Sequence, residues 1–301
     1  MIYTVTVSPA IDYVVHLDSF ETGATNRTTA EEYYFGGKGI NVSRVLKELG
    51  LPSVALGFVG GFTGQALEKG LKDAGIETDF VHVREGVTRI NVKIKAEKET
   101  EINGQGAIPD DGELCQLTKK LEKMENGDIL IISGNIPAAM PQDTYDRLMD
   151  AAGGKDIRLI VDTNGELLVR ALRYRPFLVK PNLEELKGIF GMEITAYEGA
   201  SRLREKGARN VIVSMGGDGA VLAAEDGNCY EAGVCSGDVI NTVGSGDSMV
   251  AGFLAGYMET GDYQYALDMG SAAGSATAIS PGLAERGLIE ACLGKLRRAD
   301  R

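Results

Sequence analysis

A glycine-rich turn in the last third of the chain contains the carboxylate best placed to do chemistry. The turn Asn241–Asp247 (NTVGSGD) leads into a predicted helix that starts near Ser248. Such a turn points backbone N–H groups at one place, and the helix dipole adds partial positive charge there. Gly244, Ser245 and Gly246 are therefore expected to form an anion hole for phosphoryl transfer. Asp247 is expected to be the general base for an attacking hydroxyl, although an Asp here can also serve only as a helix cap.

A second glycine turn lies near the start of the chain. The segment Gly36–Asn41 (GGKGIN) again leads into a predicted helix. It does not match a Walker A loop, because Lys38 is followed by Gly39 and not by Ser or Thr. Gly36 and Gly37 would let the backbone approach a sugar, with Asn41 one helical turn away. The alternative is a tight turn with a solvated lysine.

The elements around these turns alternate between strands and helices. Apolar runs predict buried strands, and segments with helical spacing separate them. This alternation favours an α/β fold with a Rossmann-like, mostly parallel sheet and helices on both faces. From about 251 to 277 the chain is expected to be helical, and its many Ala and Gly residues suggest close helix packing. The predicted strands are Ile2–Val7, Val54–Val59, Ile129–Ser133, Leu159–Asp162, Phe177–Lys180 and Val211–Ser214, with strand-like residues also over 229–239.

Two segments depart from this alternation. Residues 12–35 and 88–106 have strand-like alternation without intervening helices, and the second resembles an antiparallel hairpin. We expect them to form a small β-sheet lid over the main body. Because no linker or repeat interrupts the chain, residues 1–301 are predicted to be a single domain with this inserted lid.

Composition excludes several classes of function. The chain has 301 residues and a net charge of −12, which argues against nucleic-acid and membrane-surface partners. Its four cysteines form no CxxC pair, and its two histidines stand in no catalytic motif. The N-terminus reads as a strand and not as a signal peptide. We therefore expect a cytoplasmic protein whose general base is a carboxylate or another group, and not a histidine of a triad.

Together the two glycine motifs resemble the signatures of the ribokinase-like kinases of phosphofructokinase B type. GGKGINVSRVL (36–46) and NTVGSGDSMVAGF (241–253) carry this resemblance, which extends over essentially the whole chain. TRINVKI (88–94), TEINGQG (100–106) and ALGFVGGFTG (55–64) are similar to the 1-phosphofructokinases and, less closely, to the tagatose-6-phosphate kinases. The small departures are Ser8-Pro9, Asn135 and the GSGD form of the second motif.

The resemblance implies a set of sugar-binding residues. Asp12 resembles the carboxylate that accepts hydrogen bonds from substrate hydroxyls. Arg89 and Lys38 are expected to bind the phosphate already on the substrate, since Arg offers a fork of donors. Arg27 is also expected to reach that phosphate, either within its own chain or from a neighbouring subunit. The remaining substrate candidates are Gly36, Gly37, Asn41, Asn103 and Ser133.

The resemblance also implies where ATP and Mg²⁺ bind. Glu185, in the NxxE pattern with Asn182, is expected to help organise Mg²⁺, which prefers oxygen ligands and keeps several waters. The alternative for Glu185 is a solvated helix face. The expected nucleotide-binding residues are Asn164, Lys180, Asn182, Ser214, Gly216, Gly219, Gly274 and Ser275.

The implied activity is ATP-dependent phosphorylation of fructose 1-phosphate to fructose 1,6-bisphosphate, within a homodimer formed through the lid. Tagatose-6-phosphate kinase or 6-phosphofructokinase activity is the alternative within the family. A sugar-phosphate sensor of the same fold is the non-enzyme alternative, and the intact GSGD turn argues against it. Lys38 and Arg89 argue against a kinase for free ribose or nucleosides, because they imply a phosphorylated acceptor.

Overall fold

A large, mostly parallel sheet forms the body of the molecule. The computed structural model describes residues 1–299, and its sheet order is β14-β13-β12-β11-β10-β9-β1-β4-β5, with β6 paired to β4. Only the pairs β12–β13 and β13–β14 are antiparallel within this described sheet. The predicted parallel sheet is therefore confirmed. The strands are β1 (Ile2–Thr6), β4 (Val54–Gly60), β5 (Glu77–Thr78), β6 (Val81–Val83), β9 (Ile129–Ser133), β10 (Arg158–Asp162), β11 (Leu178–Val179), β12 (Asn210–Ser214), β13 (Ala220–Ala223) and β14 (Cys229–Ala232).

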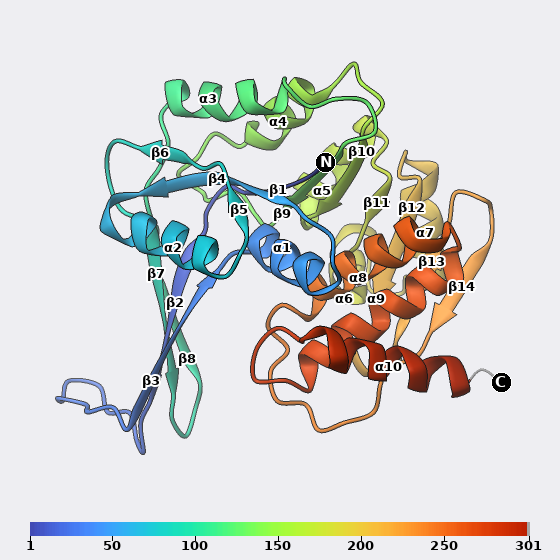
Figure 1. Cartoon of the computed structure of the whole chain (residues 1–301). Coiled ribbons are helices and arrows are strands. Elements are labelled where there is room, and N and C mark those ends of the chain that lie inside the picture. Colours follow the sequence, from blue (N-terminus) through green and yellow to red (C-terminus); the bar gives the residue numbers. More distant parts are fainter. Residues whose placement is uncertain (300–301) are drawn as a thin grey trace.

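Helices cover both faces of this sheet (Figure 1). One core joins the sheet to α3, α4, α5, α6 and α7, and the cores on the opposite face join it to α1, α2, α8, α9 and α10. The helices are α1 (Lys38–Glu48), α2 (Gly61–Asp73), α3 (Asp111–Leu121), α4 (Thr144–Ala152), α5 (Gly165–Ala171), α6 (Leu183–Phe190), α7 (Ala196–Glu205), α8 (Ser245–Thr260), α9 (Tyr263–Ala278) and α10 (Arg286–Ala299), with short 3₁₀ turns η1 (Leu172–Tyr174) and η2 (Gly216–Asp218). No helix within residues 1–299 is both long and apolar enough to span a bilayer.

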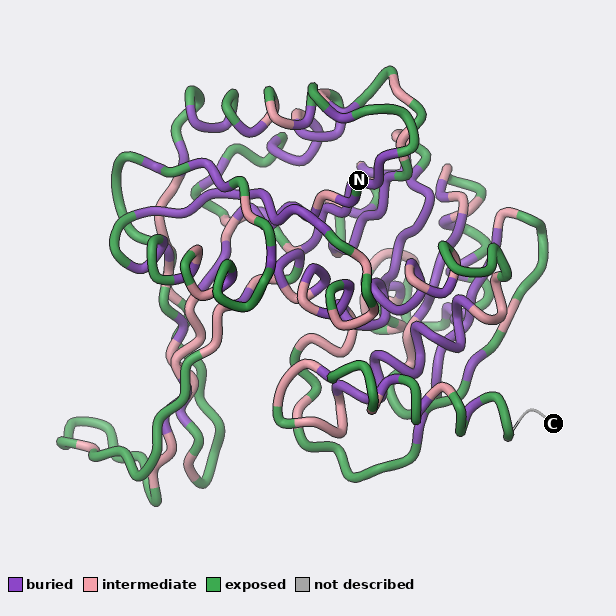
Figure 2. The backbone as a smooth tube through the Cα atoms, in the orientation of Figure 1, coloured by how far each residue is buried: buried purple, intermediate pink, exposed green. Residues whose placement is uncertain are grey.

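The strand β9 shows why its sequence is apolar throughout. Leu130 and Ile132 pack into the core with α3 to α7, whereas Ile129 and Ile131 pack into the core on the other face. Successive side chains of a strand point to opposite faces, so a sheet covered on both sides needs apolar residues at every position. The central strands are accordingly buried along their length (Figure 2).

The helical stretch expected over about 251–277 consists of two helices, α8 and α9. Gly261 has a left-handed backbone (φ 70°) and ends α8, and the side chain of Asp262 accepts a hydrogen bond from the Tyr265 amide to start α9. A glycine after a helix and an Asp before the next are ordinary stop and start signals. The Ala- and Gly-rich composition lets the two helices approach closely: a Cβ on Gly252 would lie 2.6 Å from the Met269 carbonyl.

The strand expected over 229–239 is also shorter than predicted. β14 ends at Ala232, and the chain then leaves the sheet. Side chains of α9 take over its backbone groups: Ser271 donates to the Gly233 carbonyl, and Ser275 accepts from the Cys235 amide. α8 likewise begins at Ser245, earlier than the predicted start near Ser248.

A second, four-stranded sheet projects from the body (Figure 1). It is called the lid sheet here and has the order β3-β2-β7-β8. β2–β3 and β7–β8 are antiparallel, whereas β2–β7 is parallel. A small second sheet is thus confirmed; its action as a lid and the single-domain division stay predictions. The strands are β2 (Ala10–His16), β3 (Ala30–Gly36), β7 (Arg89–Lys95) and β8 (Thr100–Asn103).

The strand register gives the lid sheet two different faces. One cross-strand row is polar and the adjacent row, on the opposite face, is largely apolar, because side chains alternate along a strand. The polar row is Tyr34, Asp12, Asn91 and Asn103, and the apolar row is Tyr33, Tyr13, Val92 and Ile102.

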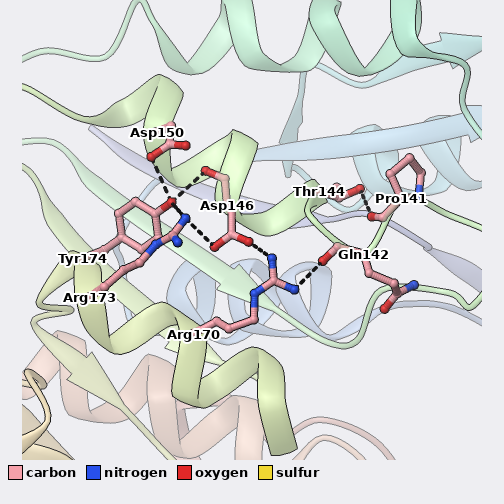
Figure 3. A network of polar contacts seen from close by, with 8 residues as sticks. All are labelled: Pro141, Gln142, Thr144, Asp146, Asp150, Arg170, Arg173 and Tyr174. Atoms are coloured by element: carbon pink, nitrogen blue, oxygen red, sulfur yellow. Dashed lines mark hydrogen bonds and ion pairs between the residues drawn. The ribbon is translucent and has the colours of Figure 1, made fainter.

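A polar network joins the helices that follow β9 and β10 (Figure 3). The carboxylate of Asp146 in α4 forms ion pairs with Arg170 of α5 and with Arg173 of η1. The second pair joins Asp146 Oδ1 to Arg173 Nη2 at 3.0 Å. The hydroxyl of Tyr174 donates to Asp150 at 2.9 Å. These contacts hold α4 against α5. They thereby support the ends of β9 and β10, which carry Ser133 and Asp162.

Candidate active site

Asn41 and Asp247 bring the two glycine motifs together. Asn41 Nδ2 donates to Asp247 Oδ2 at 2.8 Å, although the residues are 206 positions apart in the chain. Asn41 lies in the first turns of α1, and Asp247 lies in the first turn of α8 with 4% of its surface exposed. The N-termini of α1 and α8 are therefore joined through a buried carboxylate.

The start of α8 needs a glycine at position 244. Gly244 has a left-handed backbone (φ 82°), and a Cβ there would lie 2.5 Å from Leu283 Cδ2. The amides of Gly246 and Asp247 stand in the first helical turn, where a helix offers them no internal acceptor. The Ser245 amide instead donates to the Thr242 carbonyl at 3.2 Å. The geometry suits an anion, with the Ser245 amide engaged in shaping the turn.

Asp162 links two lysines beside this turn. It ends β10 with 3% of its surface exposed, and its carboxylate lies 3.5 Å from Lys180 Nζ and 3.8 Å from Lys38 Nζ. Lys180 is itself 6% exposed, and a Cβ on Gly246 would lie 3.0 Å from its ammonium nitrogen. Two cations therefore stand next to the expected anion hole, and Asp162 holds both.

This environment raises the pKa of Asp247 to about 6. Burial is the largest cause, followed by repulsion from the Asp162 carboxylate, while the Asn41 hydrogen bond and the charges of Lys38 and Lys180 oppose the rise. A general base works best when its pKa lies near the working pH. Buried carboxylates with raised pKa values are also typical of catalytic sites.

One cavity of about 660 Å³ collects four of the predicted substrate residues. We call it the cationic cavity; Gly37, Lys38, Arg89 and Ser133 line it. Ser133 Oγ and Arg89 Nε are buried and lack a hydrogen-bond partner within residues 1–299. Desolvation lowers the pKa of Lys38, but Asp162, Asp247 and Glu185 outweigh it and raise the pKa, so this 43% exposed side chain keeps its charge. Unpaired donors and a fixed cation make this cavity a suitable receptor for an anion.

A second cavity, of about 250 Å³, lies between the lid sheet and the loops before α8 and α10. We call it the lid cavity; Asp12, Gly36 and Asn41 line it. Asp12 Oδ2 would lie 3.2 Å from a Cβ on Gly36, so the absent side chain leaves the carboxylate accessible. The predicted sugar residues thus divide between two neighbouring cavities, with Asn41 connecting the lid cavity to Asp247.

The family model for pfkB carbohydrate kinases matches residues 3–289 of the chain. The chain belongs to the pfkB family of carbohydrate kinases. It is therefore a phosphotransferase, and a kinase of this family takes ATP as its co-substrate.

Individual relatives are similar over nearly their whole length. A 1-phosphofructokinase of Bacillus subtilis is 44% identical, with 99% of each chain covered. A D-tagatose-1-phosphate kinase of Bacillus licheniformis is 39% identical, with 95% of each covered. Phosphofructokinase-2 from Escherichia coli, solved in complex with substrates and products, is 31% identical with a TM-score of 0.92 and 99% of each chain covered. That enzyme has also been solved as a tetrameric inhibited form.

The residues expected to bind the nucleotide lie along the carboxyl edge of the large sheet. Lys180 follows β11, and a bridge pairs Asn182 with Ser214 at the end of β12. Gly216 begins the η2 turn that follows, Gly219 comes directly after it, and Asn164 is the N-cap of α5. Ligands of open α/β sheets bind at this edge.

Two residues of α9 approach the start of α8. A Cβ on Gly274 would lie 3.1 Å from the Ser245 carbonyl, so the two helices are in close contact there. Ser275 Oγ accepts from the Cys235 amide and holds the loop that leads to the GSGD turn. Ser275 therefore supports this loop, and its expected contact with adenine stays a prediction.

Asn182 and Glu185 have a structural task that the NxxE pattern did not reveal. They form a capping box of α6: Asn182 Oδ1 accepts from the Glu185 amide and Glu185 Oε2 accepts from the Asn182 amide, both at 2.8 Å. Such reciprocal bonds satisfy the free amides of a helix start. Glu185 Oε1 makes no hydrogen bond to the described residues, which leaves one oxygen for a cation.

Two predicted substrate residues line neither cavity. Arg27 is exposed in the loop between β2 and β3, and Asn103 is exposed on the edge strand β8. Two residues that the sequence reasoning missed are Asp162 and Asn91. Asp162 ends an apolar strand, and this position was a usable signal because strand ends form the binding edge.

Proposed function

We propose that this chain phosphorylates fructose 1-phosphate with ATP to give fructose 1,6-bisphosphate and ADP. The observation that carries the proposal is the contact of Asn41 with the buried base candidate Asp247, beside a cavity that holds Lys38 and Arg89. A general base near a cationic receptor suits a sugar that already bears a phosphate. The similarity to a 1-phosphofructokinase over the whole chain supports the same substrate.

In the proposed mechanism the C1 phosphate binds Arg89 and Lys38, and the C6 hydroxyl is directed to Asp247. Asp247 accepts the hydroxyl proton as the oxygen attacks the γ-phosphorus of ATP. The amides at the start of α8 and the ammonium group of Lys180 stabilise negative charge on the transferring group. Closure of the lid sheet excludes water and so limits ATP hydrolysis.

The donor set fits Mg²⁺ at Glu185. Mg²⁺ prefers oxygen ligands, keeps several waters and is often bound through one or two carboxylates. Glu185 is half-buried and has one carboxylate oxygen available. Its negative charge also raises the pKa of Lys38 in the cationic cavity. Bound there with the nucleotide, the ion would neutralise phosphate charge during the transfer.

The principal alternative acceptor is tagatose 1-phosphate, since a relative of 39% identity is a D-tagatose-1-phosphate kinase. The alternative expected from the sequence was tagatose 6-phosphate. Both relatives named for their substrate have it phosphorylated at C1, which favours C6 as the acceptor position. Fructose and tagatose differ only at C4, so the remaining choice concerns one hydroxyl configuration.

An ADP-release assay over a panel of sugars tests the proposal. Fructose 1-phosphate should give the highest kcat/KM, ahead of tagatose 1-phosphate, fructose 6-phosphate and free fructose. A free hexose would bring no phosphate to Lys38 and Arg89 in the cationic cavity and would bind poorly. Arg89→Ala should then lose about 2 kcal/mol of transition-state binding for the phosphorylated sugar. If another acceptor has a kcat/KM at least about tenfold higher, that acceptor is the substrate in place of fructose 1-phosphate. If the protein binds a sugar phosphate but releases no ADP, it is better explained as a sensor.

We further propose a cytoplasmic homodimer formed through the lid sheets. The face of the lid sheet opposite Asp12 exposes large apolar side chains: Tyr33 is 67% exposed, Ile102 58% and Ile90 40%. A small sheet with an uncovered apolar face gains stability when another surface packs on it. Arg27, remote from its own site, would then be available to the neighbouring subunit.

A further inference from the structure

Two side chains of β7 hold the carboxylate of Asp12. Asn91 stands directly opposite Asp12 in the parallel pair β2–β7, and its Nδ2 donates to Asp12 Oδ1 at 2.8 Å. Lys93 Nζ lies 3.9 Å from Asp12 Oδ2 and 3.8 Å from a carboxylate oxygen of Glu101. Each oxygen of Asp12 therefore has its own partner, a hydrogen bond at Oδ1 and an ion pair at Oδ2, and the two together restrict the orientation of the carboxylate.

Asn91 is poorly explained as a residue that serves stability. It is 7% exposed, and its amide oxygen Oδ1 is buried without a hydrogen-bond partner among the described residues. An unpaired buried acceptor costs free energy, and such groups in a native structure call for a functional explanation. The bond from Nδ2 to Asp12 is the only hydrogen bond of this side chain within residues 1–299. The role of the Asn91 side chain that agrees with this geometry is therefore to orient Asp12.

A carboxylate held in one orientation distinguishes between epimeric sugars better than a mobile carboxylate does. Asp12 lines the lid cavity, where the absence of a side chain on Gly36 leaves the carboxylate accessible. A freely rotating carboxylate accepts from hydroxyls in several directions and tolerates epimers. A carboxylate held in one direction favours the sugar whose hydroxyl points along it, because the epimer leaves a buried polar group unpaired.

We propose that Asn91 is a positioning residue for sugar recognition, which fixes Asp12 so that the enzyme selects ketohexose phosphates by the configuration of a ring hydroxyl. This inference rests on the proposed function, since it takes the acceptor to be a sugar phosphate bound under the lid sheet. Lys93 completes the arrangement on the other carboxylate oxygen. The substrates that expose the effect are fructose 1-phosphate and its C4 epimer, tagatose 1-phosphate.

The variant Asn91→Asp keeps the shape of the side chain, removes the donor and places a second carboxylate beside Asp12. Asn91→Ala removes the side chain and serves if the paired carboxylates prevent folding. Asn228→Asp is the matched control, because Asn228 Nδ2 also donates to an Asp carboxylate, at 3.1 Å, in an exposed turn between β13 and β14. For each protein kcat, KM for ATP, KM for both sugar phosphates and the thermal midpoint are measured.

We expect both Asn91 variants to lose about 10-fold to 100-fold in kcat/KM for fructose 1-phosphate, mainly through KM, as for a lost bond to a charged group. The preference between the two epimers should shrink at least about threefold, with KM for ATP unchanged. The control should match the wild type throughout. A fall in kcat together with a rise in KM for ATP and for both sugar phosphates would show a merely structural role and overturn the proposal. An unchanged preference between the two epimers would overturn it as well.

Failure of the proposed function gives a different pattern. If the wild type prefers fructose 6-phosphate, the substrate assignment falls, and the Asn91 comparison is made on fructose 6-phosphate and tagatose 6-phosphate with the same expected loss of selectivity. If the wild type forms ADP with none of the four sugars, both the function and the role of Asn91 are overturned.

Discussion

Asn41 and Asp247 meet at 2.8 Å from opposite ends of the chain, and each belongs to a different glycine-rich helix start. The bond orients the carboxylate and lowers its pKa, against burial and the charge of Asp162, which raise it. The pKa of Asp247 is thus set by opposing neighbours: the neutral donor Asn41 lowers it and the like charge of Asp162 raises it.

The first prediction concerns the pH dependence of the wild type. Protonated Asp247 cannot accept a proton, so kcat/KM should fall as the pH drops through the raised pKa, about 6. Asn41→Ala removes a contact that favours the charged form, and the acid limb should move to higher pH. The measurement is kcat/KM for fructose 1-phosphate between pH 5 and pH 8, a window chosen around that pKa. An acid limb that stays in place in Asn41→Ala would contradict this view of the pair.

The second prediction concerns Asp162. Asp162→Asn removes the repulsion that raises the pKa of Asp247, so the acid limb should move to lower pH, opposite to the effect of Asn41→Ala. The maximal rate should fall, because Lys38 and Lys180 lose their common anchor. Asp128→Asn is the matched control: Asp128 is also buried and ion-paired, to the amino group of Met1. Equal pH profiles for Asp162→Asn and the control would rule out this role.

The third prediction separates backbone strain from the shape of the anion hole. Gly244→Ala forces a side chain into a left-handed backbone and against Leu283, whereas Gly261→Ala meets the same backbone strain with nothing within 4 Å. The shared strain should cost each variant about 1–2 kcal/mol of unfolding free energy. Gly244→Ala should lose more stability and also most of its kcat, as shown by denaturant unfolding and steady-state rates. Similar losses in both variants would argue against a specific requirement at 244.

The fourth prediction tests the dimer. At micromolar concentration light scattering should give about twice the chain mass of 32.0 kDa. Tyr33→Asp should yield monomers, because a charge on the apolar row of the lid sheet disfavours its burial. Met192→Asp is the control, since Met192 is 71% exposed in the loop between α6 and α7. A wild type that remains monomeric with full activity would refute the lid dimer.

Much of the fold was accessible from the sequence because its signals are local. Apolar strands, helical spacing and the glycine turns predicted the parallel sheet and the two helix starts that meet at Asp247. The helical stretch over about 251–277 was also predicted, and Gly261 and Asp262 are the local signals that place the boundary between α8 and α9.

The non-local pairings escaped prediction. Asn91 faces Asp12 only because β2 and β7 pair in parallel across 79 residues, and no pattern in either strand sets that register. Asp162 gains its importance from Lys38 and Lys180, which arrive from two other elements. Such residues become visible only when the sheet order is known.

The substitution Asp247→Asn tests the assignment of the base most directly. Asn has nearly the same shape but cannot accept a proton, and general-base catalysis contributes about 10²–10⁴-fold. The variant should lose at least about a hundredfold in kcat with fructose 1-phosphate and ATP, while calorimetry still detects binding of both substrates. A variant that keeps more than about a tenth of the wild-type kcat would contradict the role of Asp247.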